Sequence, residues 1–328
     1  MALSQDTRKR VYAFCAVIFL ALIPVLTGYN DYYMHFLVLC FVWGVVAEAW
    51  NLILGYTGIF SFGQIAFFTI GAFTSGIVST KFGLSAWPAM LTASLSAGLA
   101  GLLIGLPCLR LKGEYIALVT YGLHLLLSPL IFRAQALGVE TGGFIWNLPA
   151  LTFGGYEFPR GKVLAWYYTG LFLFVILLLL IYWIIRSPIG RAFVALRDAE
   201  PLAQSAGIND YKYKLIVFSF SAFVTGVMGA FYAHYAETIS ARILGLDFFV
   251  KTLIMVVFGG LGSFPGAAIG AFIITIVYEF MRPLGSYRLI VLGVVVILTV
   301  IYLPNGMIRI PDYIGKLNVS KYSSKSPG

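Results

Sequence analysis

Long apolar segments separated by short polar ones run through almost the whole amino-acid sequence. An α-helix rises 1.5 Å per residue, so about 20 apolar residues cross the roughly 30 Å hydrocarbon core of a bilayer. The pattern predicts an all-α polytopic membrane protein, a bundle of about 8–10 transmembrane helices, some of them short or glycine-broken. Ten segments meet or come near the required length: 11–28, 33–54, 60–80, 86–107, 114–133, 163–185, 214–236, 248–262, 265–281 and 287–304.

The composition supports lipid as the main solvent of the chain. Of the 328 residues, 60% are hydrophobic and 11% are charged, whereas a soluble domain carries about 25% charged residues. The net charge of +9 first suggests a nucleic-acid partner, but the basic residues lie between the apolar segments. This distribution follows the positive-inside rule and argues against nucleic-acid binding. One bundle accommodates the chain, so we expect no second domain.

The basic residues also orient the chain. Arg8, Lys9 and Arg10 precede an apolar run, as in a signal peptide, but no small-x-small cleavage site follows, and we interpret the run as an uncleaved first helix. With the N-terminus inside, fourteen of the 22 Lys and Arg residues are cytoplasmic, which predicts cytoplasmic N- and C-termini. The predicted regions are a cytoplasmic N-terminus at 1–10, a transmembrane domain at 11–310 with an external loop at 134–162 and a cytoplasmic loop at 186–213, and a flexible cytoplasmic tail at 311–328.

The cytoplasmic loop 186–213 contains a helix-forming stretch. Asp198 is a suitable N-cap, Pro201 suits the first turn, and Gly207 suits a left-handed C-terminal residue. Leu202, Ala203 and Ala206 then share one face. A short amphipathic helix with small apolar residues is typical of insertion into a groove on another protein.

This loop resembles the EAA-type coupling loop of ABC importer permeases, which docks on the ATPase subunit. The residues before it, Arg186–Arg191 and Ala195–Asp198, are similar to the branched-chain amino acid (LivM-type) version. The resemblance implies that this segment couples to the ATPase through Arg197, Asp198, Glu200, Ala203 and Gly207. Further stretches resemble the family signatures in family order, over about 45–305: 51–64 with 71–73, 109–120, 141–143 and 258–270.

The resemblance implies the partners and the cargo as well. We expect a second permease subunit, two ATP-binding subunits, an external solute-binding protein and lipid, in a bacterial inner membrane. ATP is then used by the partner subunits, and this chain binds no cofactor. Branched-chain amino acids are the expected cargo, although relatives carry urea, short amides or other small solutes. Departures from the family pattern at Pro201, His124 and 144–147 leave the cargo open.

The glycine motifs and the polar residues within the spans are candidates for the translocation path. Glycines allow close helix packing, but they also allow a broken helix whose backbone lines a cavity. Polar side chains in a membrane are costly, so they either bond neighbouring helices or line the path. The predicted substrate-path residues are Asn51, Gly55, Gly58, Ser61, Gln64, Thr120, Gly259 and Gly260. A recurring Ser-Phe and Gly-Ala-Phe pattern, at 61–73 and 263–272, indicates an internal repeat.

Other chemistry is not indicated. The sequence contains no Gly-x4-Gly-Lys-Ser/Thr, no His-Glu-x2-His and no nucleophile elbow, and its three cysteines have no metal-type spacing. We therefore expect a transport subunit rather than an enzyme, with no catalytic residues and no metal. The alternative is an ion-coupled secondary transporter of small solutes that uses Glu48, Glu237 and Glu279. Co-purification of an ATPase favours the importer, whereas transport by the chain alone favours the alternative.

Overall fold

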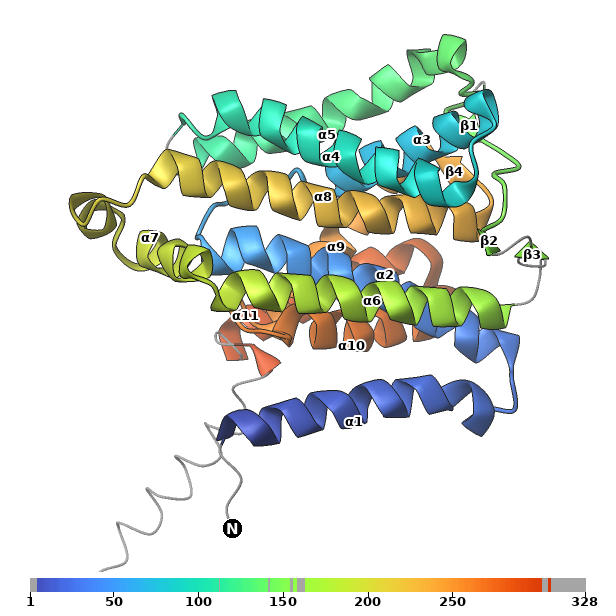
Figure 1. The fold of residues 1–328 in the computed structure, drawn as a ribbon, viewed down its shortest axis with the longest axis horizontal. Helices are drawn as coiled ribbons and strands as arrows, with labels where there is room; N and C mark the ends of the chain where they lie inside the picture. The colour runs from blue at the N-terminus through green and yellow to red at the C-terminus, as the bar shows by residue number, and fades with distance from the viewer. Residues whose placement is uncertain are drawn as a thin grey trace, which may run out of the picture.

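A computed structural model describes residues 5–302 apart from 112, 141, 154–155 and 158–162, together with 306 and 307. The predicted tail at 311–328 and the first four residues lie outside this part of the chain. The described residues form eleven α-helices, drawn in Figure 1: α1 (Gln5–Leu26), α2 (Asp31–Asn51), α3 (Gln64–Phe82), α4 (Ala86–Cys108), α5 (Tyr115–Arg133), α6 (Val163–Arg186), α7 (Pro188–Ser205), α8 (Asp210–Ala236), α9 (Leu246–Gly259), α10 (Gly266–Phe280) and α11 (Arg288–Tyr302).

The short elements are few. Residues Leu52–Tyr56 continue α2 as a π-helical turn, and 3-10 turns cover Ala134–Leu137, Ala241–Leu244 and Arg282–Tyr287. The strands are β1 (Phe144–Ile145), β2 (Thr152–Phe153), β3 (Tyr156–Glu157) and β4 (Ile239–Ser240). Strands β1 and β4 pair antiparallel, as do β2 and β3.

The prediction of an all-α polytopic membrane protein is confirmed. Each of the ten predicted spans overlaps one helix, and α7 lies in the predicted cytoplasmic loop. Six helical segments are long and apolar enough to cross a membrane by length and composition: Asp31–Tyr56, Gln64–Phe82, Ala86–Cys108, Tyr115–Arg133, Val163–Arg186 and Asp210–Ala236. Helix α9 has 14 residues and is about 21 Å long, so it is shorter than the hydrocarbon core is thick.

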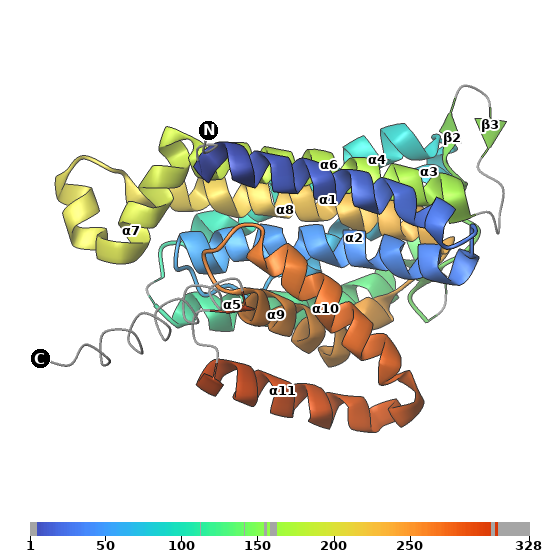
Figure 2. The same ribbon diagram turned by 90° about the horizontal axis from the view of Figure 1, so that it is seen from below.

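Helix α2 lies at the centre of the bundle. It is apolar around its whole circumference, which is the pattern of a helix buried on all sides. Its residues from Cys40 to Asn51 are all buried, and they include Trp43 and Trp50. Helices α6, α9 and α10 pack against it, and α8 joins it to the group formed by α3 and α4. Figures 1 and 2 show α1 and α11 at the periphery of this arrangement.

Small residues allow the group of α3, α4 and α8 to pack closely. A Cβ on Gly226 of α8 would overlap the Cβ of Ala97 on α4, and a Cβ on Gly71 of α3 would overlap the backbone of Gly226. Contacts between small residues drive helix association in lipid, where burial of apolar surface gives no net advantage.

The two ends of the bundle differ. Helix α7 projects beyond one end, and the four short strands lie at the other (Figures 1 and 2). At the strand end, Pro149 O accepts from His234 Nδ1 at 2.8 Å, and His234 Nε2 lies 2.8 Å from Ser75 Oγ. A carbonyl only accepts, so Nδ1 carries the proton and Nε2 accepts from Ser75. His234 thus holds Pro149 of the predicted external loop against α3 and α8.

Candidate functional site

Two glycine-containing turns lie near the α7 end of the bundle. The first turn, 57–63, joins α2 to α3, and the second turn, 260–265, joins α9 to α10. Gly58 has φ +69°, and Gly260 and Gly262 have φ +105° and +68°, conformations that side-chain-bearing residues rarely adopt. The first turn follows the π-helical residues Leu52–Tyr56. Such π-helical insertions are frequent at functional sites.

The first turn is held by side chains from three helices. Trp50 Nε1 on α2 donates to Ser61 O at 2.8 Å, and Thr120 Oγ1 on α5 accepts from Phe62 N at 2.9 Å. At the start of α3, Gln64 Nε2 donates to Ser221 and Thr225 on α8. The first turn therefore has a fixed position relative to α2, α5 and α8.

Asn51 joins α2 to the second turn. Its Oδ1 accepts from Gly262 N at 2.8 Å, and its Nδ2 donates to Ser263 O at 2.9 Å and to Glu48 Oε1 at 3.1 Å. Glu48 Oε2 in turn accepts from Ala268 N at 3.0 Å, in the first turn of α10. A carboxylate at this position satisfies a free amide and interacts favourably with the helix dipole. The buried Glu48 thus has partners within the chain.

Helix α7 carries four of the five predicted coupling residues, with Gly207 just beyond its end, and the helix is broken. Ala199 has φ −156° and ψ 78°, so the break lies one residue after Asp198, the predicted N-cap. Asp198 Oδ1 instead accepts from Arg197 Nε at 2.9 Å. After the break, Glu200 accepts from Lys214 Nζ on α8 at 2.7 Å, which ties this part of α7 to the bundle.

The C-terminal end of α7 has the expected conformation. Gly207 has φ +86°, and the amides of Gly207 and Ile208 donate to Gln204 O and Ala203 O. These bonds satisfy carbonyls that the end of the helix leaves free. Ala203 is buried, whereas Leu202 is 71% exposed. An exposed leucine on a projecting helix is available to a partner.

Arg197 brings the two predicted residue sets together. Its Nη1 donates to Gly55 O at 2.8 Å. A Cβ on Gly58 would lie 3.0 Å from Arg197 Cγ, and a Cβ on Gly262 would lie 2.6 Å from Nη1. One predicted coupling residue therefore contacts Gly55 and Gly58, two of the glycines predicted for the path, whereas Glu200, Ala203 and Gly207 lie farther along the chain.

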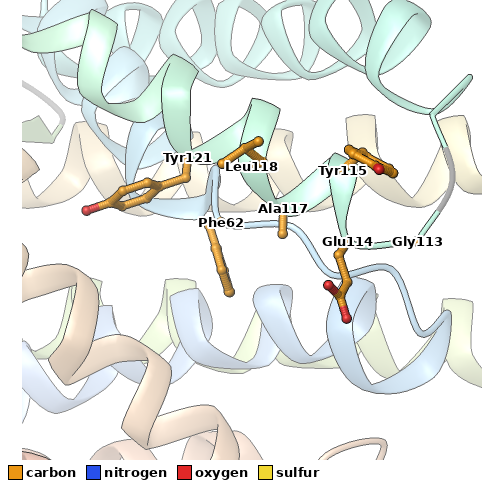
Figure 3. Close-up of a pocket in the computed structure, with 7 residues that line it drawn as sticks. All are labelled: Phe62, Gly113, Glu114, Tyr115, Ala117, Leu118 and Tyr121. Carbon is orange, nitrogen blue, oxygen red and sulfur yellow. The ribbon is translucent and has the colours of Figure 1, made fainter.

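A cavity of about 680 Å³ adjoins the first turn. Figure 3 shows the Phe62 ring and the Glu114 carboxylate projecting to the same side, from the first turn and from the start of α5. Ligand pockets have volumes of roughly 300–1,000 Å³. The cavity beside the first turn is lined by Phe62, Gly113, Glu114, Tyr115, Ala117, Leu118 and Tyr121.

The predicted path residues are not among the residues that line this cavity. Asn51, Ser61, Gln64 and Thr120 are at most 1% exposed. The side chains of Asn51, Gln64 and Thr120 bond neighbouring elements, and that of Ser61 accepts from Gly63 N in its own turn, so their lining of the path stays a prediction. Phe62 and Tyr121 were missed because aromatic residues in an apolar sequence carry no distinctive signal. The only indication in the sequence was that Phe62 and Tyr121 directly follow Ser61 and Thr120, two of the predicted path residues.

Comparison of the chain with known protein families identifies the class of protein to which it belongs. The family model described as "Branched-chain amino acid transport system / permease component" matches residues 32–300. The chain therefore belongs to this permease family. No solved structure matches it.

Particular relatives are the high-affinity branched-chain amino acid transport system permease proteins LivM and LivH of Escherichia coli K12. LivM is 30% identical over 279 residues, with 79% of this chain and 65% of LivM covered. The chain thus spans less than two thirds of LivM. LivH is 29% identical over 141 residues, with 42% of this chain and 46% of LivH covered. The probable LivM of Methanocaldococcus jannaschii is 24% identical over 317 residues, with 80% of this chain and 89% of that protein covered.

Proposed function

We propose that this chain is a permease subunit of an ABC importer and forms half of the translocation path for branched-chain amino acids or similar small solutes. The observation that carries the proposal is the match of the permease family over residues 32–300. The projecting α7, with Leu202 exposed on it, supports contact with an ATPase at that end of the bundle.

The proposed assembly contains a second permease subunit, two ATP-binding subunits and an external solute-binding protein. The similarity to both LivM and LivH, each named as a permease protein, supports two related membrane subunits. ATP is bound and hydrolysed by the partners. The charge distribution supports an inner-membrane chain with both termini in the cytoplasm, so α7 faces the ATPase.

The alternative, an ion-coupled secondary transporter, needs a buried acid that is free to exchange protons or ions. Glu48 is less suited to this role because its carboxylate accepts from Asn51 and from Ala268 N. The hydrogen bonds of Glu48 therefore favour a structural role.

Two substitutions at matched glycines test the ATPase contact. Gly207 and Gly83 both have positive φ, +86° and +65°, and a Cβ at either position would meet no atom within 4 Å. Gly207 lies at the α7 end, whereas Gly83 follows α3 at the strand end. The backbone strain of a substitution is thus similar, and only the location differs.

We expect Gly207→Glu to reduce the ATPase that co-purifies with the tagged chain at least tenfold, and Gly83→Glu to leave it unchanged. ATP-dependent uptake of radiolabelled leucine, isoleucine and valine into proteoliposomes measures the transport itself. Normal ATPase recovery with Gly207→Glu contradicts the docking role of α7. Uptake by the purified chain without any ATPase contradicts the importer.

A further inference from the structure

Arg197 occupies a niche formed by three glycines from two distant parts of the chain. Gly55 belongs to the π-helical end of α2, Gly58 to the first turn and Gly262 to the second turn. A Cβ on Gly58 or Gly262 would contact the Arg197 side chain at 3.0 Å or less. The Arg197 side chain therefore has room because Gly58 and Gly262 have no side chains.

The niche also matches the charge of arginine. Gly55 O, near the C-terminal end of α2, accepts from Arg197 Nη1 at 2.8 Å. Carbonyls at a helix C-terminus carry partial negative charge and interact favourably with cations. On the same guanidinium, Nε donates to Asp198 Oδ1 at 2.9 Å. The planar guanidinium provides donors in two directions at once, which a lysine ammonium on its flexible stem does less well.

The position of Arg197 along α7 gives this contact a mechanical consequence. The break at Ala199 separates the part of α7 that carries Arg197 from the part that Glu200 ties to Lys214 on α8. Arg197 has its side chain 35% exposed and directed toward the turns. Movement of the first part of α7 would therefore act on the second turn through the contact of Arg197 with Gly262.

We propose that Arg197 is a positioning residue that transmits movement of α7 to the second turn, while the first turn stays in place. It does so by binding the Gly55 carbonyl and filling the space beside Gly58 and Gly262. The coupling role of α7 rests on the proposed importer function, but the link between Arg197 and the turns is a property of this chain alone. Arg197 thus acts within the permease rather than at the ATPase surface.

Two readouts test the link separately. The first is the spin-label distance between Arg191→Cys on α7 and Leu261→Cys in the second turn, in a Cys15→Ser background, measured on the purified full-length chain. The second is the ratio of leucine uptake to ATP hydrolysis in proteoliposomes that contain the complete assembly. Arg110→Ala is the matched control, because Arg110 is an exposed arginine on a different connection, between α4 and α5.

We expect Arg197→Ala to broaden the distance distribution at least twofold and to lower the uptake-to-ATP ratio at least tenfold, with ATP hydrolysis within twofold of wild type. Arg197→Lys should restore part of the ratio, since a lysine still reaches one acceptor. Arg110→Ala should change neither readout. A narrow distribution or a normal ratio in Arg197→Ala overturns the proposal.

Failure of the proposed function gives a different result. If the unmodified assembly takes up no leucine, the proposed cargo is wrong. The distance measurement needs neither cargo nor ATPase, so it still supports or overturns the link between Arg197 and the turns.

Discussion

The two turns near the α7 end share a sequence pattern but are held in different ways. Each contains at least one glycine before a Ser-Phe pair, and each leads into a helix with Gly-Ala-Phe. Trp50 and Thr120 bond the first turn directly. Gln64, the next residue along the chain, bonds two residues of α8. The second turn is bonded by Asn51 and by its own Ser263, whose Oγ donates to Gly260 O at 2.6 Å.

The difference indicates a division of roles. Three of the seven residues of the first turn are partly or fully exposed, against five of the six residues of the second. Hydrogen bonds that are more accessible to solvent lower the cost of local rearrangement. We therefore infer that the first turn belongs to the fixed framework and that the second turn is the part that moves with α7.

The largest effect should come from Gly55→Ala, which would push the second turn away from the π-helical end of α2. A Cβ at Gly55 would overlap Asn51 Oδ1 and the backbone nitrogen of Gly262. Backbone atoms cannot rotate away, so we expect a loss of about 3 kcal/mol of stability, at the upper end for overpacking. Thermal unfolding in detergent measures this loss. Gly122→Ala on α5 is the control, because its Cβ would meet nothing within 4 Å.

Asn51→Ala should have the next largest effect. It removes the bonds to Gly262 N and Ser263 O and leaves polar groups without partners, which costs about 1–3 kcal/mol. We also expect several-fold lower uptake with an ATPase that still responds to the loaded binding protein. Asn30→Ala, which removes the exposed N-cap of α2, should cost about 1 kcal/mol and leave uptake unchanged. Equal effects of the two variants on uptake would contradict the role of the second turn.

The smallest effect should come from Thr120→Val in the support of the first turn. It removes the acceptor of Phe62 N and should cost about 1 kcal/mol, with an unchanged uptake-to-ATP ratio. Thr69→Val is the control, since Thr69 donates only to Ile65 O of its own helix. If Thr120→Val lowers the ratio, the first turn also takes part in transport and the division of roles is wrong.

The sequence by itself determined the class of structure and the positions of the helices. Apolar segments of about 20 residues form helices in lipid because every backbone polar group must be satisfied within the segment. Gly207 was identified as a left-handed residue for a local reason, its place at the end of a helical stretch. The recurring Ser-Phe and Gly-Ala-Phe pattern was likewise visible, and in both places it runs from a glycine-containing turn into a helix.

Only the tertiary structure decided which of these segments meet. Arg197 and Gly55 are 142 positions apart, and Asn51 and Gly262 are 211 apart. Neither contact has a local signature, because each depends on the packing of α2 against α10 and of α7 near the turns. The same holds for Glu48, whose partner Ala268 lies 220 positions away. A buried acid looks the same in the sequence whether it binds an ion or accepts from the amide of a helix N-terminus. Only the position of α10 distinguishes these two roles for Glu48.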